Sequence, residues 1–135
     1  MTIQESSSSR SHKLLAVDDV PDNLFLVQAA LNEEDGYEVN CVDSGRAALE
    51  IIANSPPDLI LLDIMMPEMS GYDVTRKVRQ NPRLSHIPIL LFTAQDDIDQ
   101  RSALEAGADG FIRKPFDIDH LVDKIEDVLQ KKAAA

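Results

Sequence analysis

The sequence predicts an α/β protein of the (βα)₅ type, a three-layer sandwich in which helices cover both faces of a parallel sheet. Short apolar runs alternate along the chain with longer segments of helical periodicity. The apolar runs are nearly continuous, which is typical of strands covered on both faces. A length of 135 residues fits one domain with a single compact core.

The first half of the chain contains three of the five repeats. Strands are expected near residues 14–18, 38–42 and 59–63, each followed by a helix, near residues 22–34, 44–54 and 70–80. Gly36 is expected to end the first helix, and Pro56 and Pro57 precede the third strand. Pro67 and Gly71 are expected to set the turn that starts the third helix.

The second half completes the pattern with strands near 87–92 and 110–113 and helices near 97–106 and 117–131. Pro88 starts the fourth strand and Gly107 closes the fourth helix. The last helix has the clearest periodicity, an apolar stripe formed by Ile118, Leu121, Val122, Ile125, Val128 and Leu129.

The ends and the composition limit the function classes. Residues 1–12 are polar and expected to form a disordered tail, residues 13–131 the domain, and residues 132–135 a short C-terminal tail. A net charge of −11 argues against nonspecific binding to nucleic acid or anionic membranes. The single cysteine, Cys41, is interpreted as core packing and fits a reducing compartment. Residues 1–13 lack the apolar run of a signal peptide, and no stretch approaches about 18 uninterrupted apolar residues. We therefore expect no membrane insertion and a cytoplasmic location.

Polar residues stand at the carboxyl ends of four predicted strands. Asp18 and Asp19 end the first strand, Asp63 the third and Thr93 the fourth, and Lys114 follows the fifth. In an open parallel sheet these ends meet at one edge, where ligands bind. The sequence therefore predicts a site with three carboxylates, one hydroxyl and one ammonium group.

This set of groups suits phosphoryl transfer, which needs charge neutralisation and positioning. Asp63 is the predicted nucleophile, forming an aspartyl phosphate. Asp19 and Asp63 are expected to ligate Mg²⁺ (or Mn²⁺) directly and Asp18 directly or through water, with the backbone carbonyl of Met65 as an uncharged ligand. Thr93 would hydrogen-bond a phosphoryl oxygen, and Lys114 would stabilise the developing charge.

Each of these residues also has a simpler interpretation. Asp18 and Asp19 could merely cap the first helix, Thr93 could be a strand-end residue, and Lys114 a solvated lysine. Their joint placement favours the site. The loop methionines Met65, Met66 and Met69 are interpreted as packing and the histidines His12, His86 and His120 as solvated.

Four stretches of the sequence resemble the receiver domains of response regulators in two-component signalling, and the resemblance covers about residues 13–131. They are Leu15-Ala16-Val17-Asp18-Asp19, Leu61-Leu62-Asp63-Ile64-Met65-Met66-Pro67-Glu68-Met69-Ser70-Gly71, Leu91-Phe92-Thr93-Ala94 and Ala106-Gly107-Ala108-Asp109-Gly110-Phe111-Ile112-Arg113-Lys114-Pro115-Phe116. The resemblance implies a doubly wound, flavodoxin-like sheet of order 2-1-3-4-5.

The resemblance also implies chemistry. Asp63 would accept a phosphoryl group from a histidine kinase or histidine phosphotransfer protein, with Mg²⁺ required, and slow autodephosphorylation would end the signal. Thr93 would shift toward the phosphoryl group and Phe111 turn inward, which reshapes the face of the fourth helix, fifth strand and fifth helix. The Lys114–Pro115 bond is expected to be cis.

The lifetime of the phosphorylated state is expected to depend on Met65 and Gln95, which stand two residues after Asp63 and Thr93. In the resemblance these positions flank the path of the attacking water. Because Met65 is apolar, it would give the water no help.

Several functions stay open. The main hypothesis is a non-enzymatic switch that regulates a downstream protein partner, as a monomer or a phosphorylation-dependent dimer, without direct nucleic-acid binding. The chain could instead be a receiver excised from a larger regulator or hybrid kinase. A small-molecule phosphatase is disfavoured because dehalogenase-like phosphatases carry an acidic proton donor where this chain has Met65. A binding-only pseudo-receiver would lack a pocket residue, and none is missing.

Overall fold

The computed structural model describes residues 12–31, 36–93, 100–114 and 117–134. In these ranges the chain forms five strands and five helices that alternate as predicted. The strands are β1 (His12–Val17), β2 (Tyr37–Val42), β3 (Leu59–Asp63), β4 (Ile89–Thr93) and β5 (Gly110–Arg113). The helices are α2 (Pro21–Ala30), α3 (Gly45–Asn54), α4 (Gly71–Gln80), α5 (Gln100–Ala106) and α6 (Ile118–Ala134).

The strands form one parallel sheet in the order β2-β1-β3-β4-β5, which confirms the predicted doubly wound, flavodoxin-like topology. The chain moves outward from β1 to β2 on one side and from β3 to β5 on the other. The strand order therefore reverses between β1 and β3, whose carboxyl ends are the expected place for a ligand site.

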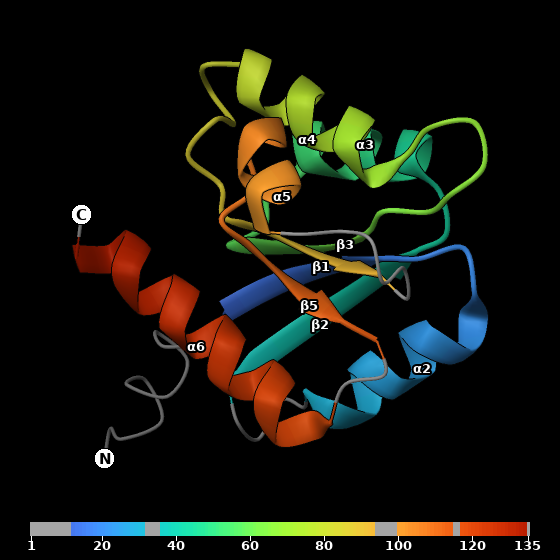
Figure 1. Cartoon of the computed structure of the whole chain (residues 1–135), viewed down its shortest axis with the longest axis vertical. Helices are drawn as coiled ribbons and strands as arrows, with labels where there is room; N and C mark the ends of the chain where they lie inside the picture. The colour runs from blue at the N-terminus through green and yellow to red at the C-terminus, as the bar shows by residue number, and fades with distance from the viewer. Residues whose placement is uncertain (1–11, 32–35, 94–99, 115–116, 135) are drawn as a thin grey trace.

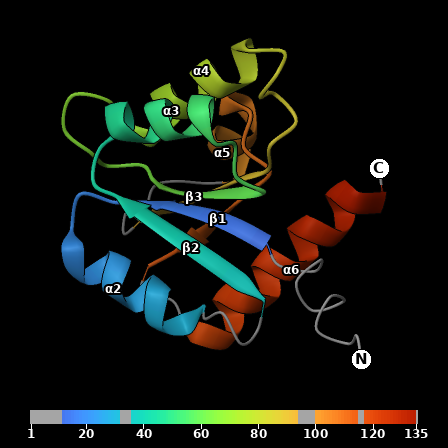
Figure 2. The same ribbon diagram turned by 180° about the vertical axis from the view of Figure 1, so that it is seen from behind.

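The helices form a layer on each face of the sheet. Figures 1 and 2 show α3, α4 and α5 on one face and α2 and α6 on the other. Side chains of β3 alternate between the two layers: Ile60 and Leu62 pack toward α3, α4 and α5, and Leu59 and Leu61 toward α2 and α6. This explains the unbroken apolar runs, because both faces of each central strand are buried.

The first helix is shorter than predicted. It ends at Ala30 and not near residue 34, because Leu31 takes an extended conformation and is buried, with 2% of its surface exposed. Gly36 does not close this helix. It has a φ of 90° and leads directly into β2, a conformation that favours glycine. Residues 32–35 lie outside the described residues.

The domain extends slightly beyond the predicted boundaries at both ends. His12, predicted as the last tail residue, begins β1 because it pairs with Tyr37 and its backbone N–H donates to the Gly36 carbonyl at 2.7 Å. The rest of the predicted tail lies outside the described residues. α6 continues to Ala134, through most of the predicted C-terminal tail. Within the described ranges, no helix combines the length and the apolar character needed to cross a membrane.

Candidate functional site

The carboxyl ends of the strands bring the predicted polar residues together. Asp18 directly follows β1, Asp63 ends β3, Thr93 ends β4 and Lys114 directly follows β5. Asp18 and Thr93 are fully buried and Asp63 is 4% exposed, so this edge of the sheet holds ionisable groups inside the fold. Asp19 is half-buried beside them.

Three carboxylates and one ammonium group form the core of the site. Each of Asp18, Asp19 and Asp63 places an oxygen within 4.8 Å of the others. The Nζ of Lys114 lies 3.0 Å from Asp18 Oδ2 and 3.4 Å from Asp63 Oδ1. One ammonium cannot neutralise three carboxylates, so the cluster attracts a further cation.

The protonation of Asp63 reflects this crowding. Burial away from water raises the pKa of its carboxyl to about 6, and the negative charge of Asp18 acts in the same direction. The positive charge and hydrogen bond of Lys114 and a backbone hydrogen bond from Met65 oppose the rise. Asp63 is therefore mostly ionised at neutral pH, although less completely than an exposed aspartate.

Asp18 holds several groups in place at once. Its Oδ1 accepts a hydrogen bond from the Val20 backbone N–H at 2.9 Å. Its Oδ2 accepts from Asn23 Nδ2 at 2.9 Å and from Lys114 Nζ at 3.0 Å. The helix-cap interpretation of Asp18 is thus partly right, because it orders the start of α2, but the same carboxylate also binds the lysine. The N-cap residue of α2 is Val20, without a side-chain cap.

The loop after Asp63 is fixed by the start of α4. Ser70 and Asp73 form a reciprocal capping box, with hydrogen bonds of 3.1 and 3.2 Å. The Gly71 backbone N–H donates to the Ile64 carbonyl at 2.9 Å. A Cβ at Gly71 would stand 2.4 Å from the Asp63 carbonyl oxygen. Glycine was expected here for the turn; the close approach to Asp63 is an additional reason that the sequence alone does not reveal.

Thr93 and Lys114 are joined through the backbone, since the Lys114 N–H donates to the Thr93 carbonyl at 2.7 Å. Phe111, on β5, is half-buried and packs against the core cluster beneath α3, α4 and α5. Its ring also lies 5.9 Å from the guanidinium carbon of Arg113.

Phe92 is part of the site that the sequence reasoning missed. The Lys114 ammonium lies 4.8 Å from the centre of its ring. Its position directly before Thr93 could have indicated that it belongs to the site. An aromatic residue in a buried strand is, however, usually interpreted as part of the hydrophobic core.

The remaining predicted residues are less central. Met66 is buried and Met69 partly buried in the core cluster, which agrees with their interpretation as packing. The same interpretation was wrong for Met65, because its side chain is 56% exposed. Burial raises the pKa of the Cys41 thiol, which packs against the other core cluster. Gln95 and Pro115, and with Pro115 the predicted cis bond, lie outside the described residues.

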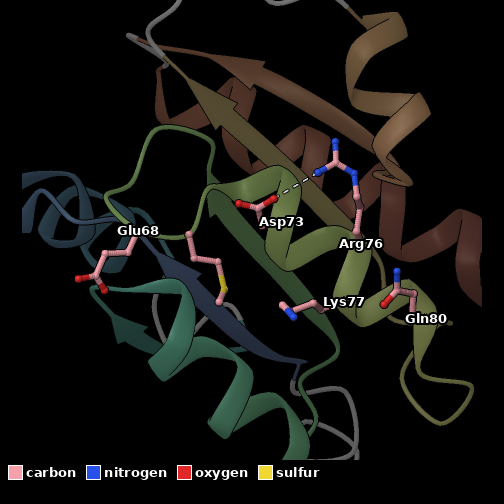
Figure 3. Close-up of a pocket in the computed structure, with 6 residues that line it drawn as sticks. Glu68, Asp73, Arg76, Lys77 and Gln80 are labelled. Atoms are coloured by element: carbon pink, nitrogen blue, oxygen red, sulfur yellow. Dashed lines mark hydrogen bonds and ion pairs between the residues drawn. The ribbon is translucent and has the colours of Figure 1, made fainter.

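A surface hollow lies apart from the acidic cluster. It has a volume of about 280 Å³ and is lined by Glu68, Met69, Asp73, Arg76, Lys77 and Gln80. Figure 3 shows these side chains along α4 and the loop before it, with Asp73 and Arg76 joined by an ion pair of 3.3 Å. None of the residues that line this hollow belongs to the acidic cluster, so the predicted chemistry is located elsewhere.

Comparison with known families gives one clear match. The family model described as the response regulator receiver domain matches residues 14–126. Response regulator PleD from Caulobacter vibrioides is 44% identical over 108 residues, covering 79% of this chain and 24% of PleD. A probable cyclic di-GMP phosphodiesterase from Vibrio cholerae is 40% identical over 120 residues, covering 88% of this chain and 27% of that protein. The chain thus spans about a quarter of the length of these two relatives.

Solved structures of response regulators and receiver domains have the same fold as this chain. A putative response regulator from Chloroflexus aurantiacus has a TM-score of 0.83 at 36% identity, covering 89% of this chain and 98% of that chain. The receiver domain of the sensor histidine kinase PA1611 from Pseudomonas aeruginosa has a TM-score of 0.80 at 29% identity, with 89% and 98% covered. In the PA1611 structure a magnesium ion is coordinated in the active site cleft.

Proposed function

Starting from the fact that this chain belongs to the response regulator receiver domain family of two-component signalling, we propose that it is a switch controlled by phosphorylation of Asp63. The observation that supports this most directly is the position of Asp63. Its carboxylate is buried at the switch point of the sheet, within 4.8 Å of two further carboxylates and 3.4 Å from the Lys114 ammonium.

Asp63 acts as the nucleophile in this proposal. One of its oxygens attacks the phosphorus of a phosphohistidine on the donor protein, a new O–P bond forms, and the P–N bond breaks with its electron pair left on the imidazole. The carboxylate is largely ionised at neutral pH, since its pKa is about 6. Dephosphorylation returns the carboxylate and releases inorganic phosphate when a water oxygen attacks the same phosphorus.

The residues present fit a hard divalent cation. Asp18, Asp19 and Asp63 supply convergent carboxylate oxygens, and the charge excess over Lys114 favours Mg²⁺ or Mn²⁺. The Met65 carbonyl is the proposed uncharged ligand. When bound, the ion would neutralise charge on the phosphoryl oxygens. Lys114 would provide positive charge to those oxygens, and Thr93 a hydroxyl donor.

The signal leaves the site through Thr93 and Phe111 in this proposal. Thr93 moves toward the phosphoryl oxygen and Phe111, now half-buried, turns further inward, which changes the face formed by α5, β5 and α6. Met65 and Gln95 tune the lifetime of the phosphorylated state. If Met65→Asn or Met65→Glu left the dephosphorylation rate unchanged, this role of Met65 would be excluded.

The partners follow from the same proposal. A histidine kinase or histidine phosphotransfer protein supplies the phosphoryl group, and a downstream protein binds the face formed by α5, β5 and α6. The chain acts in the cytoplasm, as a monomer or a phosphorylation-dependent dimer. Because the matched part makes up only 27% and 24% of the first two relatives, a receiver module within a larger regulator or hybrid kinase is the main variant. We propose no turnover of an external substrate and no direct contact with nucleic acid or insertion into a membrane.

Incubation with acetyl phosphate and Mg²⁺ tests the proposal. The expected result is one phosphoryl group per chain, stable to neither acid nor base, absent from Asp63→Asn and from samples with excess chelator. Asp58→Asn is a suitable control, because Asp58 is exposed and its side chain accepts a hydrogen bond from the Lys13 N–H, away from the acidic cluster. Labelling that persists in Asp63→Asn, or steady turnover of phosphate esters, would contradict the proposed switch.

A further inference from the structure

We infer that Phe92 is a positioning residue whose aromatic face holds the Lys114 ammonium beside Asp63. This inference rests on the function proposed above, in which Lys114 acts on the phosphoryl group. The Lys114 Nζ lies 4.8 Å from the centre of the Phe92 ring, within the range of a cation–π interaction. Both groups are shielded from water, with 3% of Phe92 and 15% of the lysine side chain exposed.

The sheet itself fixes the place of the ring. Phe92 on β4 pairs in register with Asp63 on β3. The ring packs with Leu61 and Ile112 in the core cluster beneath α2 and α6, and Lys114 follows Ile112 by two residues. Strand side chains alternate between faces, so Asp63, Phe92 and Lys114 share one face. The position of the Phe92 ring in the site is therefore set by the register of the strands and does not depend on a loop.

The ring stabilises the ammonium without using any of its hydrogen-bond donors. A lysine ammonium has three donors, and two of them point to Asp18 Oδ2 and Asp63 Oδ1, at 3.0 and 3.4 Å. The π face attracts the positive charge from a further direction and leaves the third donor for an incoming phosphoryl oxygen. An aliphatic side chain of similar size would fill the same space but would not attract the charge.

The predicted consequence concerns rate. Without the ring, the Lys114 ammonium would be better stabilised by water than by its place in the site. A smaller fraction of the molecules would then hold it beside Asp63, where the phosphoryl group arrives. Preorganised charge is the main contribution of a protein to phosphoryl transfer. Weakening the π face is thus expected to slow the phosphorylation of Asp63 without changing the packing of β4.

The test replaces Phe92 in the full chain with phenylalanine carrying one, two and three fluorine atoms. Each fluorine weakens the negative ring face while keeping its shape. The rate constant for phosphorylation by acetyl phosphate with saturating Mg²⁺ should fall stepwise, roughly 3- to 30-fold over the series. The matched control is the same series at Phe25, which is 71% exposed and should give no trend. A rate that does not change with fluorination at position 92 would overturn the inference and leave Asp63 as acceptor.

A second readout is independent of phosphorylation. In metal-free protein without donor, the Phe92 ring current should shift the Lys114 ε-methylene protons upfield. The shift should disappear in Phe92→Leu, which removes the ring, and persist in Phe92→Tyr, which keeps it, so this signal tests whether the ring and the ammonium are in contact. If the wild-type chain took up no phosphoryl group, the proposed function would fail, and this shift would still decide where the ammonium lies. An unshifted lysine signal in the wild type would refute the contact.

Discussion

Gly71 lies so close to the backbone of Asp63 that a Cβ at Gly71 would stand 2.4 Å from the Asp63 carbonyl oxygen. Neither group can move easily, because Asp63 is within the sheet and Gly71 begins α4 behind the Ser70 cap. The glycine thus sets how closely α4 approaches the end of β3.

Gly71→Ala is expected to displace the end of β3. The clash is with backbone, so the free energy of unfolding should fall by roughly 1–3 kcal/mol and the phosphorylation rate of Asp63 should fall with it. Gly45→Ala is the matched control: its Cβ would meet the Val74 side chain at 2.9 Å, which should lower stability but not the phosphorylation rate per folded molecule. Chemical denaturation and acetyl phosphate labelling measure the two effects. Equal rates in both variants would show that the α4 approach does not position Asp63.

Removing one carboxylate from the cluster should stabilise the metal-free protein. Asp19 adds a negative charge beside two others, so Asp19→Asn should raise the unfolding midpoint in chelator. Mg²⁺ should stabilise the wild type by about 2.7 kcal/mol at 100 times its Kd, and Asp19→Asn much less, because binding to the folded state alone shifts the equilibrium. Thermal unfolding with and without Mg²⁺ measures this. A midpoint that Mg²⁺ moves equally in both proteins would remove Asp19 from the site.

The raised pKa of Asp63 makes stability depend on pH. Between the ordinary value of 3.8 and the folded value of about 6, the folded protein keeps a proton on Asp63 that the unfolded chain has lost. The free energy of unfolding contributed by this group therefore decreases as the pH rises through that window and is constant above it.

Asp63→Asn lacks the titrating carboxyl and is the appropriate reference. In metal-free buffer the variant should gain stability relative to the wild type as the pH rises from about 4 to about 6, since only the wild type must ionise a buried group. Denaturation at several pH values, with the Asp63 carboxyl carbon followed by NMR, checks the expectation. A constant difference between the two proteins would mean that Asp63 titrates normally.

Arg79 forms a clamp at the opposite end of the sheet. Its Nε donates to the Gly107 carbonyl at 2.7 Å, and its Nη1 to the carbonyls of Ser85 and Ile87 at 3.1 and 2.7 Å. Its Nη2 lies 3.0 Å from Asp109 Oδ2. The planar guanidinium thus holds the segments that lead into β4 and β5, a geometry that lysine cannot reproduce.

Arg79→Lys should therefore lower the free energy of unfolding by roughly 2–4 kcal/mol, because the half-buried carbonyls lose their donors. Arg76→Lys, one turn away on α4, changes an exposed ion pair with Asp73 and a surface contact with the Tyr72 ring, and should alter stability by less than about 0.5 kcal/mol. Urea denaturation of both variants makes the comparison. Similar small losses would show that water replaces the clamp.

The comparison of Arg76 with Arg79 illustrates what sequence patterns can and cannot predict. Periodicity identified α4, and the polar residues that end each apolar run located the acidic cluster, because parallel strands place their carboxyl ends at one edge. Both arginines look alike in that pattern. The partners of Arg79 lie up to 30 residues away in sequence, so its role depends on the assembled fold.

Dependence on the assembled fold also explains why the roles of Phe92 and Gly71 could not be predicted from the sequence. Phe92 became part of the site through its register with Asp63, and Gly71 through its approach to the Asp63 carbonyl; both are contacts between elements. The end of α2 was placed too late because Leu31 is buried outside the helix, a tertiary effect that overrides local helix propensity.

Because Asn23 and Lys114 share one carboxylate oxygen of Asp18, a change at Lys114 should be detectable at Asn23. Asn23 Nδ2 and Lys114 Nζ compete for the same oxygen, at 2.9 and 3.0 Å. When the lysine turns away from Asp18, that oxygen becomes a stronger acceptor for the Asn23 amide, whose proton resonance should then move downfield. The amide signal of Asn23, at the start of α2, can therefore report whether the Lys114 ammonium contacts Asp18, without any label placed in the acidic cluster.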